Sequence, residues 1–185
     1  MATQFLTRYN PKGIFPSPIE VMAERFGLEI YPVPNFRDSR GNRTAALNND
    51  AVSITIDENA SFGAYRFALA HEIGHVYLHR EFIQSIAIAG INPIESWRDR
   101  LRKDNPKVLT DLERQANIFA RLVLLPDAHF RTAKSALEAA LPTGLDWFVV
   151  TDSVFDKLTE KLADDLGTTS QSVVNRLKDF GINRD

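Results

Sequence analysis

The most informative segment of this chain is residues 68–79, ALAHEIGHVYLH. Its apolar residues recur with helical spacing, and His71 and His75 are four residues apart, so a helix places both imidazoles on one face, one turn apart. Two such imidazoles can bind one Zn²⁺ ion at the usual Zn–N distance of about 2.0–2.1 Å. Glu72 lies about 100° around the helix axis from His71. From there its carboxylate can accept a proton from a water held on the metal.

A catalytic zinc site usually has a third protein ligand. The chain contains no cysteine, so this ligand must be His, Asp or Glu. His79 lies one turn further along, but residues at i, i+4 and i+8 spread over about 12 Å of a straight helix, too far for one ion. His129 carries no distinguishing pattern. Glu113 is the better candidate, at the edge of an apolar helical stripe. An alternative is that Glu113 closes a capping box with Thr110, and spacing alone favours neither interpretation.

Outward from this segment, the hydrophobic pattern predicts strands first and helices afterwards. We expect helices at residues 18–26, 61–78 and 110–125, strands at residues 28–33, 44–47 and 52–56, and two or three further helices toward the C-terminus. The sequence NND at residues 48–50 is typical of a hairpin turn. The predicted fold class is therefore α+β, with a small N-terminal antiparallel sheet packed on the HExxH helix and a helical C-terminal part.

The composition limits the classes of partner. Lys and Arg total 22 and Asp and Glu total 24, a net charge of −2, so the chain as a whole does not attract nucleic acid or anionic membranes. The N-terminal residues lack the apolar region of a secretory signal, and no stretch approaches the roughly 18 consecutive apolar residues of a membrane span. We therefore expect a cytoplasmic protein with no membrane partner.

Residues 151–185 have the spacing of a helix-turn-helix-like hairpin, with a break at Gly167 between two apolar seams. This segment contains seven acidic and five basic residues, which offers little attraction for DNA phosphates. We expect a structural hairpin that is integral to the same domain as residues 1–150, and no direct DNA binding. The length of 185 residues suits one hydrophobic core.

Two separated motifs resemble the ImmA/IrrE family of metallo-endopeptidases: RFALAHEIGHVYLH at residues 66–79 and ERQANIFARLVLLP at residues 113–126. The resemblance implies a zincin-like, gluzincin-related metallopeptidase core at residues 1–150. It further implies that His71, His75 and Glu113 bind one Zn²⁺ per chain, with Mn²⁺ as an alternative, and that Glu72 is the general base. In such peptidases the substrate adds a strand along a sheet edge, here expected at residues 52–57.

The chain departs from this family in two respects. Gln115 occupies a position where many members have a second acidic residue, which leaves Glu113 as the acidic candidate of that motif. Residues 80–109 form a long insert with an apolar first half and a charged second half. This insert could be a lid over the cleft or a packed surface excursion, that is, a segment that simply packs on the surface. We favour the packed excursion. Candidates for stabilising an oxyanion are Tyr65, Tyr77 and His129, with no preference among them.

The leading hypothesis is a zinc-dependent endopeptidase that cleaves a specific protein partner, and the family implies a transcriptional repressor or antitoxin-like regulator as that partner. The alternative is a non-catalytic regulatory module, with a structural metal, that docks DNA or a protein. A third hypothesis is a zinc hydrolase that acts on a non-peptide bond, which the HExxH pattern alone does not exclude.

Overall fold

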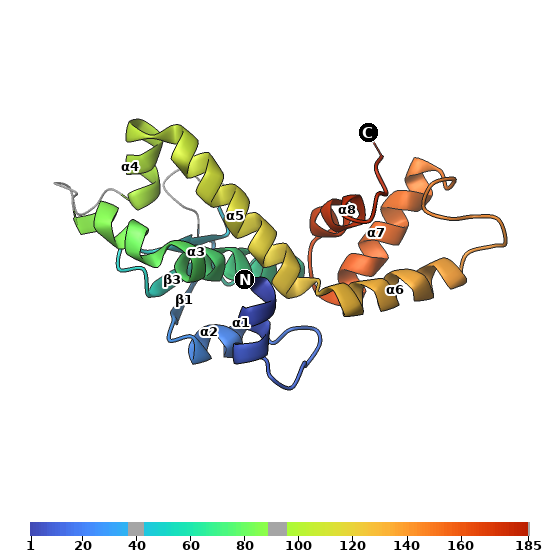
Figure 1. Ribbon diagram of the computed structural model, residues 1–185, viewed down its shortest axis with the longest axis horizontal. Coiled ribbons are helices and arrows are strands. Elements are labelled where there is room, and N and C mark those ends of the chain that lie inside the picture. Colours follow the sequence, from blue (N-terminus) through green and yellow to red (C-terminus); the bar gives the residue numbers. More distant parts are fainter. Residues whose placement is uncertain (37–42, 89–95, 185) are drawn as a thin grey trace.

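The computed structural model describes residues 1–36, 43–88 and 96–184. Along the chain its elements are α1 (Ala2–Tyr9), α2 (Ile19–Arg25), β1 (Glu29–Val33), β2 (Ala45–Leu47), β3 (Ser53–Asp57), α3 (Phe62–Ile88), α4 (Trp97–Asp104), α5 (Pro106–Leu124), α6 (Asp127–Ala139), α7 (Asp152–Leu166) and α8 (Ser170–Lys178). The strands lie in the N-terminal half and the sheet packs on α3, while the remainder is helical (Figure 1). The predicted α+β class is therefore confirmed.

The sheet has three strands in the order β1-β3-β2. The turn at residues 48–50 joins β2 and β3 into the predicted antiparallel hairpin, whereas β1 pairs with β3 in parallel, so the sheet is mixed. Because β3 is paired on both sides, residues 52–57 are not the sheet edge that we expected for a substrate strand. The alternating pattern of β3 was misleading because Ser53 is buried, with its hydroxyl bonded to Asp50. The edge beside α3 is β2.

Helix α3 is the central element of the fold. It runs from Phe62 to Ile88, ten residues beyond the predicted end at residue 78. Its buried residues Leu69, Ala70 and Ile73 belong to one continuous hydrophobic core. The helix contacts β2 and β3 as well as α5, so it lies between the sheet and the second long helix.

Helix α5 begins earlier than predicted, at Pro106 instead of residue 110. Pro suits the first position of a helix because its missing N–H has no intrahelical partner there. The side chain of Asn105 caps this end by accepting a hydrogen bond from the Val108 N–H at 3.3 Å. Thr110 lies inside the helix and its hydroxyl donates to the Pro106 carbonyl at 3.0 Å. The capping-box interpretation of Thr110 and Glu113 is therefore wrong.

The insert at residues 80–109 contains the end of α3, helix α4 and the start of α5, and its residues 89–95 lie outside the described part. Helix α4 packs against α3 and α5, as expected for a packed excursion, with Trp97, Arg98 and Leu101 buried. Arg98, however, is directed into the interior, so α4 does more than cover the surface.

The chain beyond α5 is helical, and α6, α7 and α8 gather past its C-terminal end (Figure 1). Helix α7 ends at Gly167, whose positive φ of 64° forms a left-handed cap, and the Thr169 side chain caps α8. The predicted helical hairpin is therefore confirmed. Among the described residues, none of the helices combines the length and the apolar character needed to cross a bilayer.

Candidate metal centre

Helices α3 and α5 supply the side chains of the candidate site, and they approach closely at Gly74. A Cβ atom at Gly74 would lie 3.0 Å from Cδ1 of Phe119 and 3.3 Å from Cα of Ala116. A glycine inside a helix costs roughly 1 kcal/mol relative to alanine. Close backbone approach explains why glycine occurs here, and it brings His71 and His75 on α3 opposite Glu113 on α5.

The three predicted metal ligands converge. Nε2 of His71 lies 3.0 Å from Nε2 of His75 and 3.2 Å from Oε2 of Glu113, while Nε2 of His75 lies 3.7 Å from Oε1 of Glu113. Ligand atoms of a tetrahedral zinc with bonds of 2.0–2.1 Å are about 3.3 Å apart. The described His71, His75 and Glu113 therefore fit one ion, and this cluster could hold a metal.

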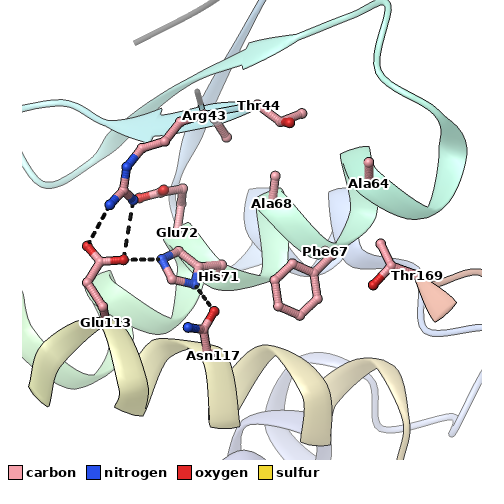
Figure 2. A pocket seen from close by; sticks show the side chains of 11 residues that line it. Arg43, Thr44, Ala64, Phe67, Ala68, His71, Glu72, Glu113, Asn117 and Thr169 are labelled. Carbon is pink, nitrogen blue, oxygen red and sulfur yellow. Dashed lines mark hydrogen bonds and ion pairs between the residues drawn. The ribbon is translucent and has the colours of Figure 1, made fainter. Parts of the chain in front are cut away.

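The orientation of His71 is set by Asn117, one turn after Glu113 on α5. Nδ1 of His71 lies 2.9 Å from Oδ1 of Asn117 (Figure 2). An amide oxygen only accepts hydrogen bonds, so Nδ1 carries the proton and Nε2 presents its lone pair toward the cluster. A hydrogen bond of this kind orients a metal-binding imidazole and fixes its tautomer. Asn117 follows Glu113 by four residues, so both side chains lie on one face of α5.

His75 is held neutral by its surroundings. Its side chain is fully buried, and the Trp97 ring packs edge-on against it at a centroid distance of 5.1 Å. Burial lowers the pKa of His75 to about 3, although its hydrogen bond with Glu113 acts in the opposite direction. A neutral imidazole is the form that binds a metal.

Glu72 is buried beside the cluster, with 1% of its surface exposed. Its Oε2 accepts hydrogen bonds from Nη2 of Arg98 at 2.7 Å and from the Leu47 N–H at 3.0 Å. Burial raises the pKa of Glu72, but the positive charge of Arg98, together with His71 and His75, outweighs burial and leaves the pKa below its ordinary value. Glu72 is therefore an ionised carboxylate next to the cluster and not one of its three members.

Two arginines at the site were missed by sequence reasoning. Nε of Arg98 donates to Oε1 of Glu113 at 2.9 Å, and both Nη atoms of Arg43 lie 3.3 Å from Glu113 oxygens (Figure 2 shows the Arg43 pair). Burial raises the pKa of Glu113, but the adjacent His71 and His75 rings and the charge of Arg98 lower it well below its usual range. Nothing in the sequence distinguished Arg98, because the charged segment WRDRLRKD is typical of a solvent-exposed helix.

A cavity of about 400 Å³ opens onto the cluster. The lining residues come from β2 and the segment just before it, from α3, from α5 and from the α7–α8 turn. They are Arg43, Thr44, Ala45, Ala64, Phe67, Ala68, His71, Glu72, Glu113, Asn117 and Thr169. Edge strand β2 thus forms one wall of the cavity, and α3 and α5 form its base (Figure 2).

The other candidate residues lie outside this centre. The ring of His79 is 5.9 Å from that of His75, and His79 is not part of the ligand cluster, as expected from helix geometry. His129 stacks on Phe15 at 4.3 Å and lines a different cavity. Tyr77 packs among core aromatic rings, and neither it nor Tyr65 lines the cavity at the cluster. None of the three oxyanion candidates is therefore placed to contact a ligand there.

Comparisons with known proteins show the family and the fold of the chain. A family model described as the IrrE N-terminal-like domain, of peptidase M78, matches residues 18–178. No curated protein sequence matches the chain. A solved structure of a Mycobacterium tuberculosis transcriptional regulator shares the fold, with a TM-score of 0.57 and 18% sequence identity. The match covers 96% of this chain and 46% of that one, so the chain spans about half the length of the regulator.

Proposed function

The chain belongs to the peptidase M78 family, and on this premise we propose that it is a zinc-dependent endopeptidase that cleaves a specific protein partner. The observation that carries the proposal is the convergence of His71, His75 and Glu113 beside the ionised carboxylate of Glu72, in a cavity bounded by a sheet edge. The donor set of two imidazoles and one carboxylate is typical of a catalytic zinc with an open position. Mn²⁺ is the alternative ion.

Each side chain has a distinct task in this mechanism. When bound, zinc would lower the pKa of its water and polarise the scissile carbonyl. Both hydrogen bonds that the described residues give to Glu72 fall on Oε2, which leaves Oε1 to accept the proton of the attacking water. Glu72 then donates this proton to the leaving amine. Asn117 keeps His71 in the tautomer that presents Nε2 to the metal.

Strand β2 is suited to hold the substrate backbone. The Asp57 N–H donates a hydrogen bond to the Thr44 carbonyl at 2.8 Å, so the backbone polar groups of Thr44 point toward β3. In an antiparallel pair the next residue alternates, so the backbone N–H and carbonyl of Ala45 point away from β3. Leu47 faces the same way as Ala45, but its N–H and carbonyl are bonded to Glu72 and Trp97. We therefore expect an extended substrate to pair with Ala45 and to leave the strand edge near Glu72.

We propose a transcriptional repressor or antitoxin-like regulator as the protein partner. Support comes from the resemblance to the ImmA/IrrE endopeptidases and from the shared fold with the transcriptional regulator. The cavity itself is compatible with an extended peptide, because it is open along β2 and is lined by polar and apolar residues alike.

The first test is the metal content of the purified protein and of Glu113→Ala, measured by elemental analysis after purification without chelator. We expect about one zinc per wild-type chain and a marked loss in the variant. Absence of metal from the wild type, even after zinc is added back, would contradict the endopeptidase proposal.

The second test compares the zinc-loaded wild type with Glu72→Gln on a library of cellular peptides, with new N-termini identified by mass spectrometry. The variant should retain metal and produce no wild-type cleavage sites, because the amide cannot accept a proton. Cleavage by Glu72→Gln at the native rate would rule out this mechanism. A binding module would instead show no proteolysis by either protein, and its DNA affinity would decrease steeply with salt.

A further inference from the structure

We propose that Arg98 is a positioning residue that holds Glu72 outside the coordination sphere of the metal, so that the site keeps an open position. This inference rests on the proposed zinc site. The side chain of Arg98 is 5% exposed, and it lies between the two carboxylates, with Nη2 on Glu72 and Nε on Glu113. Arg98 thus occupies a fixed place between the base and the ligand.

The neighbours of Arg98 fix its position. Ser96 caps α4 by accepting a hydrogen bond from the Asp99 N–H at 3.1 Å. The backbone N–H of Trp97 donates to Oδ1 of Asn49 at 3.0 Å, and its ring N–H donates to the Leu47 carbonyl at 3.3 Å. Trp97 therefore attaches helix α4 to the β2–β3 hairpin. Because Arg98 is the next residue, its guanidinium is held on a rigid element.

Without such a partner, Glu72 would be a buried carboxylate adjacent to His71 and close to a divalent cation. A buried charge without a partner is strongly unfavourable, so the side chain would turn toward the nearest cation. Arg98 and the Leu47 N–H prevent this by bonding the same oxygen, Oε2, from α4 and β2. Glu72 is accordingly not a member of the ligand cluster, which among the described residues contains His71, His75 and Glu113.

This role predicts an unusual direction for the effect of a mutation. Arg98→Met removes a positive charge beside the cation site and frees a carboxylate that can become a fourth protein ligand. Both changes strengthen the binding of Zn²⁺. If Arg98 only supported the shape of the site, its loss would weaken the binding instead, as loss of a group that orients a ligand does. The two interpretations therefore differ in sign.

The experiment measures Zn²⁺ affinity by competition with a chromophoric chelator, and ligand geometry by the absorption spectrum of the Co²⁺-substituted protein. We expect Arg98→Met to bind Zn²⁺ about tenfold more tightly than the wild type and to change the Co²⁺ spectrum. Arg98→Met combined with Glu72→Gln should lose this gain, because the freed carboxylate is gone. Arg102→Met is the matched control, since Arg102 pairs with Asp99 on the same helix and should leave both measurements unchanged.

Equal or weaker Zn²⁺ binding by folded Arg98→Met, with an unchanged Co²⁺ spectrum, would overturn the inference. If Arg98→Met does not fold, Arg98→Gln replaces it, with the same expected direction and the same contradicting result. Failure of the proposed function would be distinct, since the wild type itself would then bind no zinc. If the wild type binds zinc and requires Glu72 for cleavage but Arg98 variants bind Zn²⁺ like the wild type, only this inference fails.

Discussion

At the scale of single residues, the site is a set of buried and half-buried charges that compensate one another. Glu72 and Glu113 carry two negative charges, and Arg98 contacts both of them, while Arg43 contacts Glu113. Removing one partner of a buried ion pair is costly because it leaves an uncompensated charge. His75 differs from these groups, because it is buried and neutral and therefore resists protonation.

The metal-free protein should lose stability as the pH decreases from 7 to 5. The pKa of His75 is about 3 in the folded state against 6.5 for the free side chain, so the unfolded chain binds more protons between these values. Stability therefore falls as pH falls through this window, and at pH 5 the loss is about 2 kcal/mol. The lowered pKa values of Glu72 and Glu113 remove further stability below their ordinary value of 4.5.

Urea unfolding of the chelator-treated protein at several pH values measures this loss. His75→Gln should remove most of the pH dependence between 7 and 5, whereas His129→Gln, a change outside the site, should retain it. An unfolding free energy of the metal-free wild type that stays constant over this range would contradict the assignment of His75 as a buried neutral histidine.

Sequence reasoning found the residues whose spacing is local and missed those brought in from a distance. His71, Glu72 and His75 follow from one helical repeat, and Glu113 follows from a second motif. Arg98 and Arg43 reach the site only because α4 and the segment just before β2 fold over it. A charged helix of eight residues has no periodic signal that separates its buried arginine from its partly exposed ones.

At the scale of elements, the crossing of α3 and α5 determines the geometry of the ligand cluster. The helices approach closely where Gly74 meets Ala116 and Phe119, within one turn of the candidate metal ligands. A mid-helix glycine is typical of such a close approach. By contrast, helix α1 was not predicted because half of its residues are polar, although Phe5 is fully buried and Ala2 and Tyr9 nearly so.

The position of β3 also depends on information that a short pattern lacks. Alternation of Ile54 and Ile56 with polar residues predicted a strand, and this is confirmed. Whether that strand is at the edge or in the interior depends on where β1 pairs, which is a contact between distant segments. The predicted substrate edge therefore shifts from β3 to β2.

We expect Gly74→Val to destabilise the protein and to weaken zinc binding. The added side chain would press on Phe119 and on the Ala116 backbone, and overpacking of this kind costs about 1–3 kcal/mol. Separating the helices also moves Glu113 away from His71 and His75. Ser85→Val on the exposed side of α3 is the control and should change stability by less than about 0.5 kcal/mol. Chemical denaturation and chelator competition measure the two effects, and an unaltered zinc affinity would contradict this account.

At the scale of the whole molecule, the C-terminal hairpin is attached to the part that carries the candidate metal site through the start of α3. Nε of Arg66 donates to the Gly167 carbonyl at 2.8 Å, and its Nη2 donates to the Ser17 carbonyl at 2.6 Å. Arg66 is buried and thus connects the α7–α8 turn to the segment before α2. Thr169 of the same turn lines the cavity at the metal cluster, so the hairpin also contributes to the site.

The prediction that residues 151–185 are integral to the domain of residues 1–150 can be tested at Gly63. A Cβ atom at this position would lie 2.2 Å from the Thr168 carbonyl oxygen and 2.7 Å from its carbon, so Gly63→Ala must displace the backbone of the α7–α8 turn. The chain has two tryptophans. Trp97 packs beside His75, and Trp147 packs against Phe155 on α7. Trp97→Phe therefore leaves Trp147 as a fluorescent reporter packed on the hairpin, and Trp147→Phe leaves Trp97 as a reporter beside the candidate metal site.

If the hairpin is integral, both reporters should give the same unfolding midpoint, because a single domain unfolds cooperatively. Gly63→Ala should then lower both midpoints together, by a free energy of about 1–3 kcal/mol. Two separate midpoints, with Gly63→Ala shifting only the one reported by Trp147, would show instead that the hairpin is an independent unit. The cavity wall at Thr169 would in that case belong to a movable part of the molecule, and access of a substrate to β2 would depend on it.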